Sequence, residues 1–78
     1  MKKYFFHIRT PTQMDIDTIG TECTCDDDAI AEAHQAAKEI VAEWILSEHV
    51  IDGEAFEIVN EHGELVALLQ FKDVMRFH

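Results

Sequence analysis

The sequence predicts an α+β domain of two layers, in which one long helix packs on one face of a mainly antiparallel four-stranded sheet in the order ββαββ. Residues 3–9 combine three aromatic residues with a β-branched one, as a well-buried strand does. Residues 24–48 contain no Gly or Pro, and two apolar runs separated by Gly63 follow them. A chain of 78 residues makes one compact domain, 1–78, in which residues 73–78 form either a tail or a short last element.

The first strand is expected at residues 3–9, where alternate side chains face opposite sides of the sheet. The core-facing set is Tyr4, Phe6 and Ile8. On the other face, His7 is expected to have a structural partner, such as a carboxylate or a backbone carbonyl on the adjacent strand. The apolar run is too short for a secretory leader, so we expect a cytoplasmic protein.

The second strand is expected at residues 14–18, where apolar and polar residues alternate after a turn that contains Pro11. Its two aspartates, Asp15 and Asp17, suit an edge strand, because charge there discourages unwanted pairing. Gly20 then allows the chain to turn away.

The helix is expected to begin at Thr24, with Asp27 reaching back to complete a capping box and with Asp26 as an alternative cap. It should continue to about Glu48. Its apolar residues recur at spacings of three and four and form one stripe, which contains Ile30, Ala33, Ala37, Ile40, Val41 and Trp44.

The last two strands are expected at residues 56–60 and 65–71, joined by a short loop at 61–64. The final strand is apolar on both faces, so it is either central or covered on its second face by something other than the helix. One helix can cover only one face of the sheet. The side chains expected on the open face, as an interface, are Phe5, Val59, Val66 and Leu68.

Charge restricts the partners. The net charge is −10, with only six Lys and Arg residues, which disfavours binding to nucleic acids and to anionic membranes. No apolar run approaches the roughly 20 residues that span a bilayer. A homodimer or a protein partner remains, and self-association would also help a domain small enough to be marginally stable.

Several segments together resemble a family of small bacterial proteins of unknown function. They are Tyr4-Phe5-Phe6-His7, the acidic hairpin ending near Gly20-Thr21-Glu22, the alanine-rich helix, Phe56-Glu57-Ile58 and Glu61-His62-Gly63-Glu64-Leu65. The resemblance covers nearly the whole chain and implies one compact domain, but it implies no activity. Cys23-Thr24-Cys25 and the C-terminal residues 75–78 lie outside the shared pattern.

Chemical motifs are sparse. Cys23 and Cys25 are expected to be free thiols, and with His7 they are the candidate ligands for a metal. Their spacing of one intervening residue, without a second pair, predicts no metal site, and we expect no cofactor. No hydrolase, nucleotide-binding or zinc-peptidase motif occurs. We therefore expect a small, acidic, non-enzymatic interaction module that forms homodimers through the open sheet face; the alternative is a redox-responsive or metal-responsive protein that uses Cys23 and Cys25.

Overall fold

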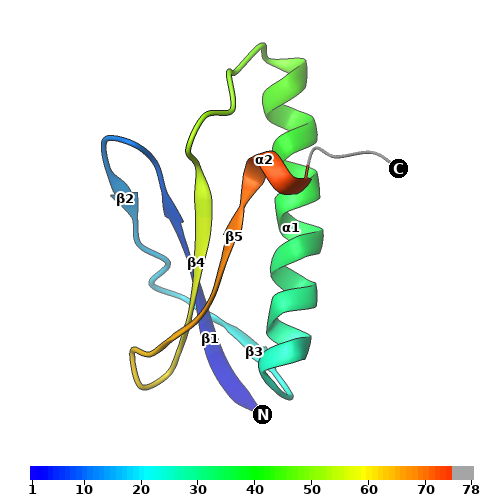
Figure 1. Ribbon diagram of the computed structural model, residues 1–78. Coiled ribbons are helices and arrows are strands. Elements are labelled where there is room, and N and C mark those ends of the chain that lie inside the picture. Colours follow the sequence, from blue (N-terminus) through cyan, green and yellow to red (C-terminus); the bar gives the residue numbers. More distant parts are fainter. Residues whose placement is uncertain (75–78) are drawn as a thin grey trace.

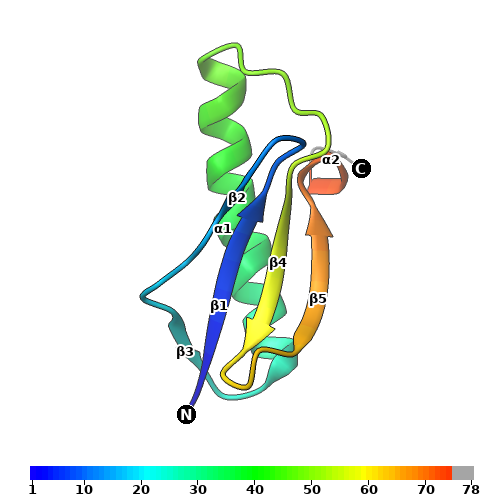
Figure 2. The same ribbon diagram turned by 90° about the vertical axis from the view of Figure 1, so that its left-hand side faces the viewer.

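The computed structural model describes residues 1–74 and confirms the α+β architecture. A single long helix lies along one side of an antiparallel sheet (Figure 1), and the opposite face of the sheet carries no helix (Figure 2). In chain order the elements are β1 (Lys2–Arg9), β2 (Met14–Asp15), β3 (Thr21–Cys23), α1 (Asp26–Leu46), β4 (Ala55–Asn60), β5 (Leu65–Gln70) and α2 (Phe71–Val74).

The sheet has the order β2-β1-β4-β5, and β3 also pairs with β1. All pairings are antiparallel. The strand predicted at 14–18 was wrong in extent, because only Met14–Asp15 pairs and the same edge resumes at Thr21–Cys23, which the sequence analysis did not predict as a strand. The sheet is therefore four strands wide, with one of its edges built from two short pieces.

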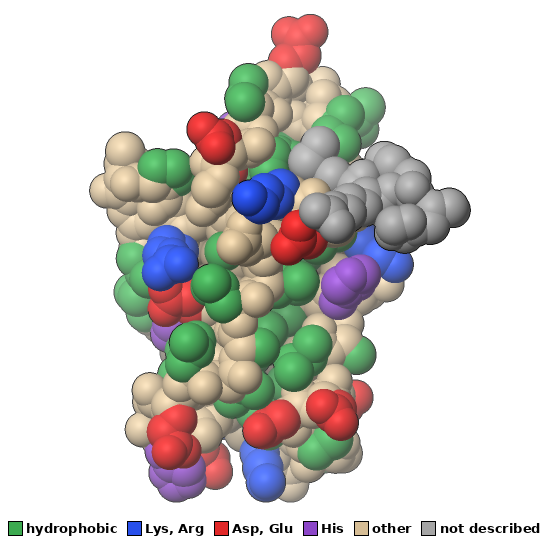
Figure 3. Space-filling view, in the orientation of Figure 1, with side chains coloured by type: hydrophobic (Ala, Val, Ile, Leu, Met, Phe, Trp, Pro, Cys, Tyr) green, Lys and Arg blue, Asp and Glu red, His purple; other side chains and the backbone are tan. Residues whose placement is uncertain are grey.

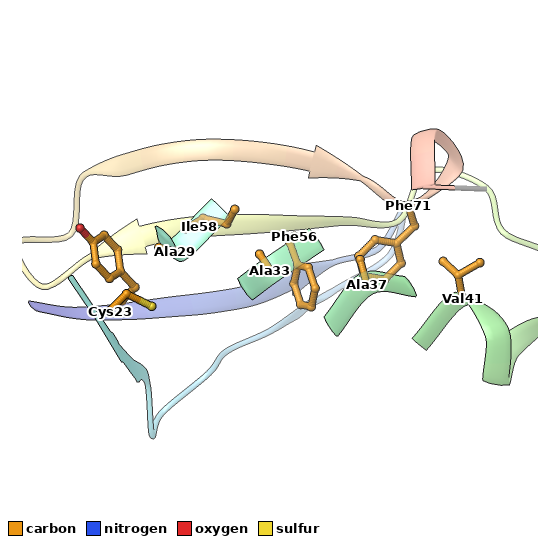
Figure 4. Packing of buried hydrophobic residues seen from close by; sticks show 9 residues of the cluster. Cys23, Ala29, Ala33, Ala37, Val41, Phe56, Ile58 and Phe71 are labelled. Atoms are coloured by element: carbon orange, nitrogen blue, oxygen red, sulfur yellow. The ribbon is translucent and has the colours of Figure 1, made fainter. Parts of the chain in front are cut away.

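The core lies between the sheet and α1. The helix presents a buried row of small side chains, which are Ala29, Ala33, Ala37 and Val41. Figure 4 shows Phe56 beside Ala33 and Phe71 next to Ala37. Small side chains allow the helix to approach the sheet closely, so that the aromatic rings fill the space between the layers. Phe56 and Phe71 meet edge to face with their ring centroids 5.0 Å apart.

The start of α1 differs from the prediction by one residue. Cys25 is the N-cap residue and makes no side-chain capping bond. Instead Asp28 accepts hydrogen bonds from the backbone N–H and the hydroxyl of Thr24, both at 3.2 Å. The helix start is also attached to the sheet, because the buried hydroxyl of Tyr4 donates to Asp26 at 2.6 Å.

The C-terminal strand ends one residue earlier than predicted, because Phe71 begins α2 and its side chain is fully buried. Its N–H still continues the ladder and donates to the carbonyl of Glu54 at 3.0 Å. Of the predicted terminal segment 73–78, residues 73–74 belong to α2 and residues 75–78 lie outside the described residues. Within the described part of the chain, no helix combines the length and the apolar character that a membrane span requires.

Candidate functional site

The open face of the sheet is formed by the side chains that alternate with the core-facing ones. Phe5 lies opposite Val59, and His7 lies opposite Glu57, which in turn lies opposite Leu68. Leu68 is 42% exposed, whereas the other four side chains are half-buried against one another. Three of the four side chains predicted for this face therefore lie on it together.

Val66 is the exception, and its expected place on the open face is wrong. Its side chain packs against the hydrophobic core on the helix side. The register between β4 and β5 shifts here, because Ile58 pairs with Ala67 while Val59 pairs with Leu65. Val66 is thus the additional residue of a β-bulge, and such a residue breaks the strict alternation that the prediction assumed.

Polar groups accompany the apolar ones on this face. Arg9 makes an ion pair with Glu57 at 3.1 Å, and the Arg9 side chain is 49% exposed, so the pair contributes little to stability. The rings of Phe5 and His7 stack with their centroids 6.3 Å apart. The result is a face that is partly apolar and contains both signs of charge.

A side chain completes the interrupted edge of the sheet. Between the pairing of β1 with β2 and its pairing with β3, segment 16–20 runs beside β1 without forming a strand. In this gap the carboxylate of Asp17 takes the place of a strand carbonyl and accepts the N–H of Phe6 at 3.1 Å. Its other oxygen accepts the N–H groups of Ile19 and Gly20 at 3.0 and 3.1 Å. Burial would raise the pKa of Asp17, but the three backbone N–H donors outweigh it, and the pKa is lowered.

His7 belongs to the same arrangement, and its partner differs from the one expected. The backbone N–H of Asp17 donates to His7 Nδ1 at 3.0 Å, so the ring acts as an acceptor rather than as a donor to a carboxylate or a carbonyl. That bond requires Nδ1 to be unprotonated. Asp17 therefore attaches segment 16–20 to β1 twice, through its backbone N–H to His7 and through its carboxylate to the N–H of Phe6.

The cysteines do not form a site with His7. Cys23 is buried in the core with 1% exposure, and burial raises the pKa of its thiol, as does the negative charge nearby. Cys25 is exposed, and both thiols are free. His7 lies on the opposite face of the sheet from the core that holds Cys23. Among residues 1–74 no three His, Cys, Asp or Glu side chains are grouped so that they could hold a metal ion.

The carboxylate of Glu54 is buried, which the sequence pattern did not predict. Glu54 is 7% exposed; its carboxylate lies 3.1 Å from His49 Nε2 and accepts the N–H of Asp52 at 2.6 Å. Burial would raise the pKa of Glu54, but the hydrogen bonds from His49 and Asp52 outweigh it and lower the pKa. The ring of His49 also packs against Trp44, 4.5 Å between centroids.

A carboxylate beside an imidazole can act in general acid–base catalysis, but the pair of Glu54 and His49 has a structural role. It ties the loop that follows α1 to the start of β4, and both carboxylate oxygens are already engaged. No periodic signal marks this arrangement in the sequence, because its members belong to a helix end, a loop and a strand start. A Glu directly after the Asp52-Gly53 turn was the only available indication.

Comparison with known proteins gives a family without an assigned activity. No curated protein and no solved structure matches the chain. The model of one family, described as a domain of unknown function, matches residues 3–72. This range contains all of α1 and all five strands except Lys2, the first residue of β1. The chain therefore belongs to the domain of unknown function family DUF6894.

Proposed function

We propose that this domain is a non-enzymatic protein-interaction module that forms a homodimer through its open sheet face. The observation that carries the proposal is the group formed by Phe5, Val59 and Leu68, which lies on a sheet face without a helix layer. A two-layer domain of this size buries only about 60% of the surface of its unfolded chain, so covering this face would add substantially to its core.

The distribution of charge favours a second copy as the occupant. All six acidic residues of α1 are exposed, and they lie on the layer opposite the open face: Asp26, Asp27, Asp28, Glu32, Glu39 and Glu43. The open face instead carries both signs of charge, with Lys3 opposite Glu22 and Arg9 beside Glu57. Two copies that meet by their open faces place their acidic helices on the outside, far from each other, so the net charge of −10 per chain opposes this contact least.

The same charge supports a protein partner over a nucleic acid or an anionic membrane. The two free thiols suit a reducing compartment, which supports a cytoplasmic location.

Sedimentation velocity from micromolar to millimolar concentration tests the proposal. The wild-type protein should reach at least twice its chain mass of 9.0 kDa as concentration rises. Val59→Asp places a charge on the open face and should halve the mass that the protein reaches. Val50→Asp, the same change at a position that is 79% exposed in a loop, should leave association unchanged.

Circular dichroism shows whether each variant folds. If Val59→Asp does not fold, Val59→Thr replaces it, because Thr has the same shape and suits a strand. A wild-type protein that is monomeric at millimolar concentration contradicts the proposal. So does a folded Val59 variant that associates as strongly as the wild type.

A further inference from the structure

The two edges of the sheet are protected to very different degrees. One edge consists of β2 and β3, which have two and three residues, and the acidic residues Asp15, Asp17 and Glu22 lie along it. Short, interrupted and charged edges resist pairing with other chains. The other edge is β5, which runs for six residues and contains no charged residue.

Some backbone groups of β5 point outward from the sheet. Phe71 donates its N–H to the carbonyl of Glu54, so Phe71 belongs to the set of residues whose backbone groups face β4. In an antiparallel ladder, every second residue turns its backbone groups toward the neighbouring strand, so Leu69 and Ala67 also face β4. The backbone N–H and C=O groups of Leu68 and Gln70 therefore point away from β4, toward the side on which the sheet as described has no further strand.

The surface around this edge is apolar. Figure 3 looks onto the molecule from the side of β5 and α1 and shows hydrophobic side chains gathered in the middle, with charged side chains mainly above and below them. Leu65 and Leu68, both on β5, are 61% and 42% exposed. The bulge at Val66 disturbs only the beginning of the strand and leaves residues 67–70 in regular register.

From this edge we infer a second contact between copies: β5 pairs antiparallel with β5 of another copy, in the register that places Leu68 opposite Leu68. This pairing supplies partners to the outward groups of Leu68 and Gln70 in both chains. It brings no charge against a like charge within the strands, although each chain carries −10. Glu64 just before the strand then lies toward the second copy's Lys72 just after it, so the ends are of opposite charge.

The contact goes beyond the proposed function, because it uses backbone groups at an edge instead of side chains on a face. Pairing by β5 extends the sheet from one copy into the next and leaves both open faces on the same side. Two such extended sheets can then stack by their open faces, so the two contacts together give an assembly of four chains.

Leu68→Pro tests the edge, with Leu68→Ala as its matched control. Both variants remove the leucine side chain, but only proline removes the outward N–H, and proline is tolerated where the N–H of an edge strand does not bond within the sheet. By sedimentation velocity, Leu68→Pro should lose half of the assembly mass relative to Leu68→Ala. A folded Leu68→Pro variant with the mass of the Ala variant overturns the inference.

Amide hydrogen exchange of the wild-type protein, read by NMR, tests the same contact without a substitution. The amides of Leu68 and Gln70 should exchange at least tenfold more slowly at millimolar than at micromolar concentration, whereas that of Leu69, which faces β4, should be protected at both. Exchange at Leu68 and Gln70 that is fast at every concentration refutes edge pairing.

The two contacts fail separately. If Val59→Asp abolishes association while Leu68 and Gln70 exchange fast, the face contact stands and the edge contact is wrong. If those two amides are slow and Val59→Asp still associates as the wild type does, the edge contact stands and the face contact is wrong.

Discussion

Replacing Asp17 with Ala should destabilise the domain by about 2.5–4 kcal/mol. The carboxylate accepts three backbone N–H groups, and that of Phe6 lies in the half-buried gap between β2 and β3. Loss of a hydrogen bond to a charged acceptor costs about 1.5–3 kcal/mol for such a donor, and the N–H groups of Ile19 and Gly20, which water can reach more easily, add about 0.5 kcal/mol each. Domains of this size have a total stability of only about 4–12 kcal/mol, so the change should be obvious.

Urea denaturation followed by circular dichroism measures the effect. Asp15→Ala is the control, because Asp15 is an exposed neighbour on the same edge, pairs with Ile8 through its backbone, and carries the same charge. It should change the free energy of unfolding by less than about 0.5 kcal/mol. If both variants lose the same amount, the carboxylate of Asp17 does not hold the edge together and the reasoning is refuted.

The pH dependence gives an independent check on Asp17. Its pKa is lowered in the folded protein, so its contribution is present above the unfolded value of about 3.9 and is lost as pH falls through the folded value. The difference in stability between the wild type and Asp17→Asn should therefore be constant near neutral pH and shrink in acid. A difference that grows in acid contradicts the assignment.

Three further predictions concern other contacts. In urea denaturation, Gly20→Ala should lower the free energy of unfolding by about 2–3 kcal/mol and Gly63→Ala by about 1 kcal/mol. Both glycines have φ near +80°, but of the two only Gly20 has side chains where a Cβ would lie, with Lys3 Cγ 2.9 Å away. Equal losses of stability would refute the steric argument. Glu54→Gln should lower the free energy of unfolding by about 1–2 kcal/mol, because it weakens the hydrogen bond to His49, whereas the control Glu61→Gln, at an exposed position, should cause no measurable change. The loss of stability should become smaller in acid, because the pKa of Glu54 is lowered in the folded protein. Tyr4 is the only tyrosine in the sequence, and the hydrogen bond to Asp26, together with burial, raises its pKa to about 12. Phenolate absorbance of the folded protein should therefore appear about two pH units higher than in the unfolded chain, and stability should fall as pH rises from about 10 to 12. Ionisation of Tyr4 near pH 10 in the folded protein would contradict the Tyr4–Asp26 bond.

Local patterns were enough to predict the layers of this fold. The alternation in residues 3–9 placed Tyr4 in the core and Phe5 on the open face, and the spacing of Ala33, Ala37 and Val41 gave the buried side of α1. Both signals are periodic, so each is repeated several times along the chain and tolerates one irregular residue.

The details that were missed depend on single residues or on distant contacts. Val66 was assigned to the wrong face because a bulge adds one residue, and nothing in an apolar run such as 65–69 marks where that occurs. The interrupted edge depends on Asp17 accepting the N–H of Phe6, eleven residues away along the chain. The link between His49 and Glu54 likewise becomes visible only when the loop after α1 is placed against β4.

The acidic residues of this domain do two separable things. Asp17, Asp26, Asp28 and Glu54 each accept hydrogen bonds from identified donors and so help to define the structure. The other exposed acids along the outside of α1 are Asp27, Glu32, Glu39 and Glu43, whereas β5 contains no charged residue. Solubility alone would not require this separation. Their placement makes approach of another copy least favourable at the helix and at the β2–β3 edge, and most favourable at the open face and at β5. Charge of one sign therefore directs where copies can meet, even though it opposes their meeting in general.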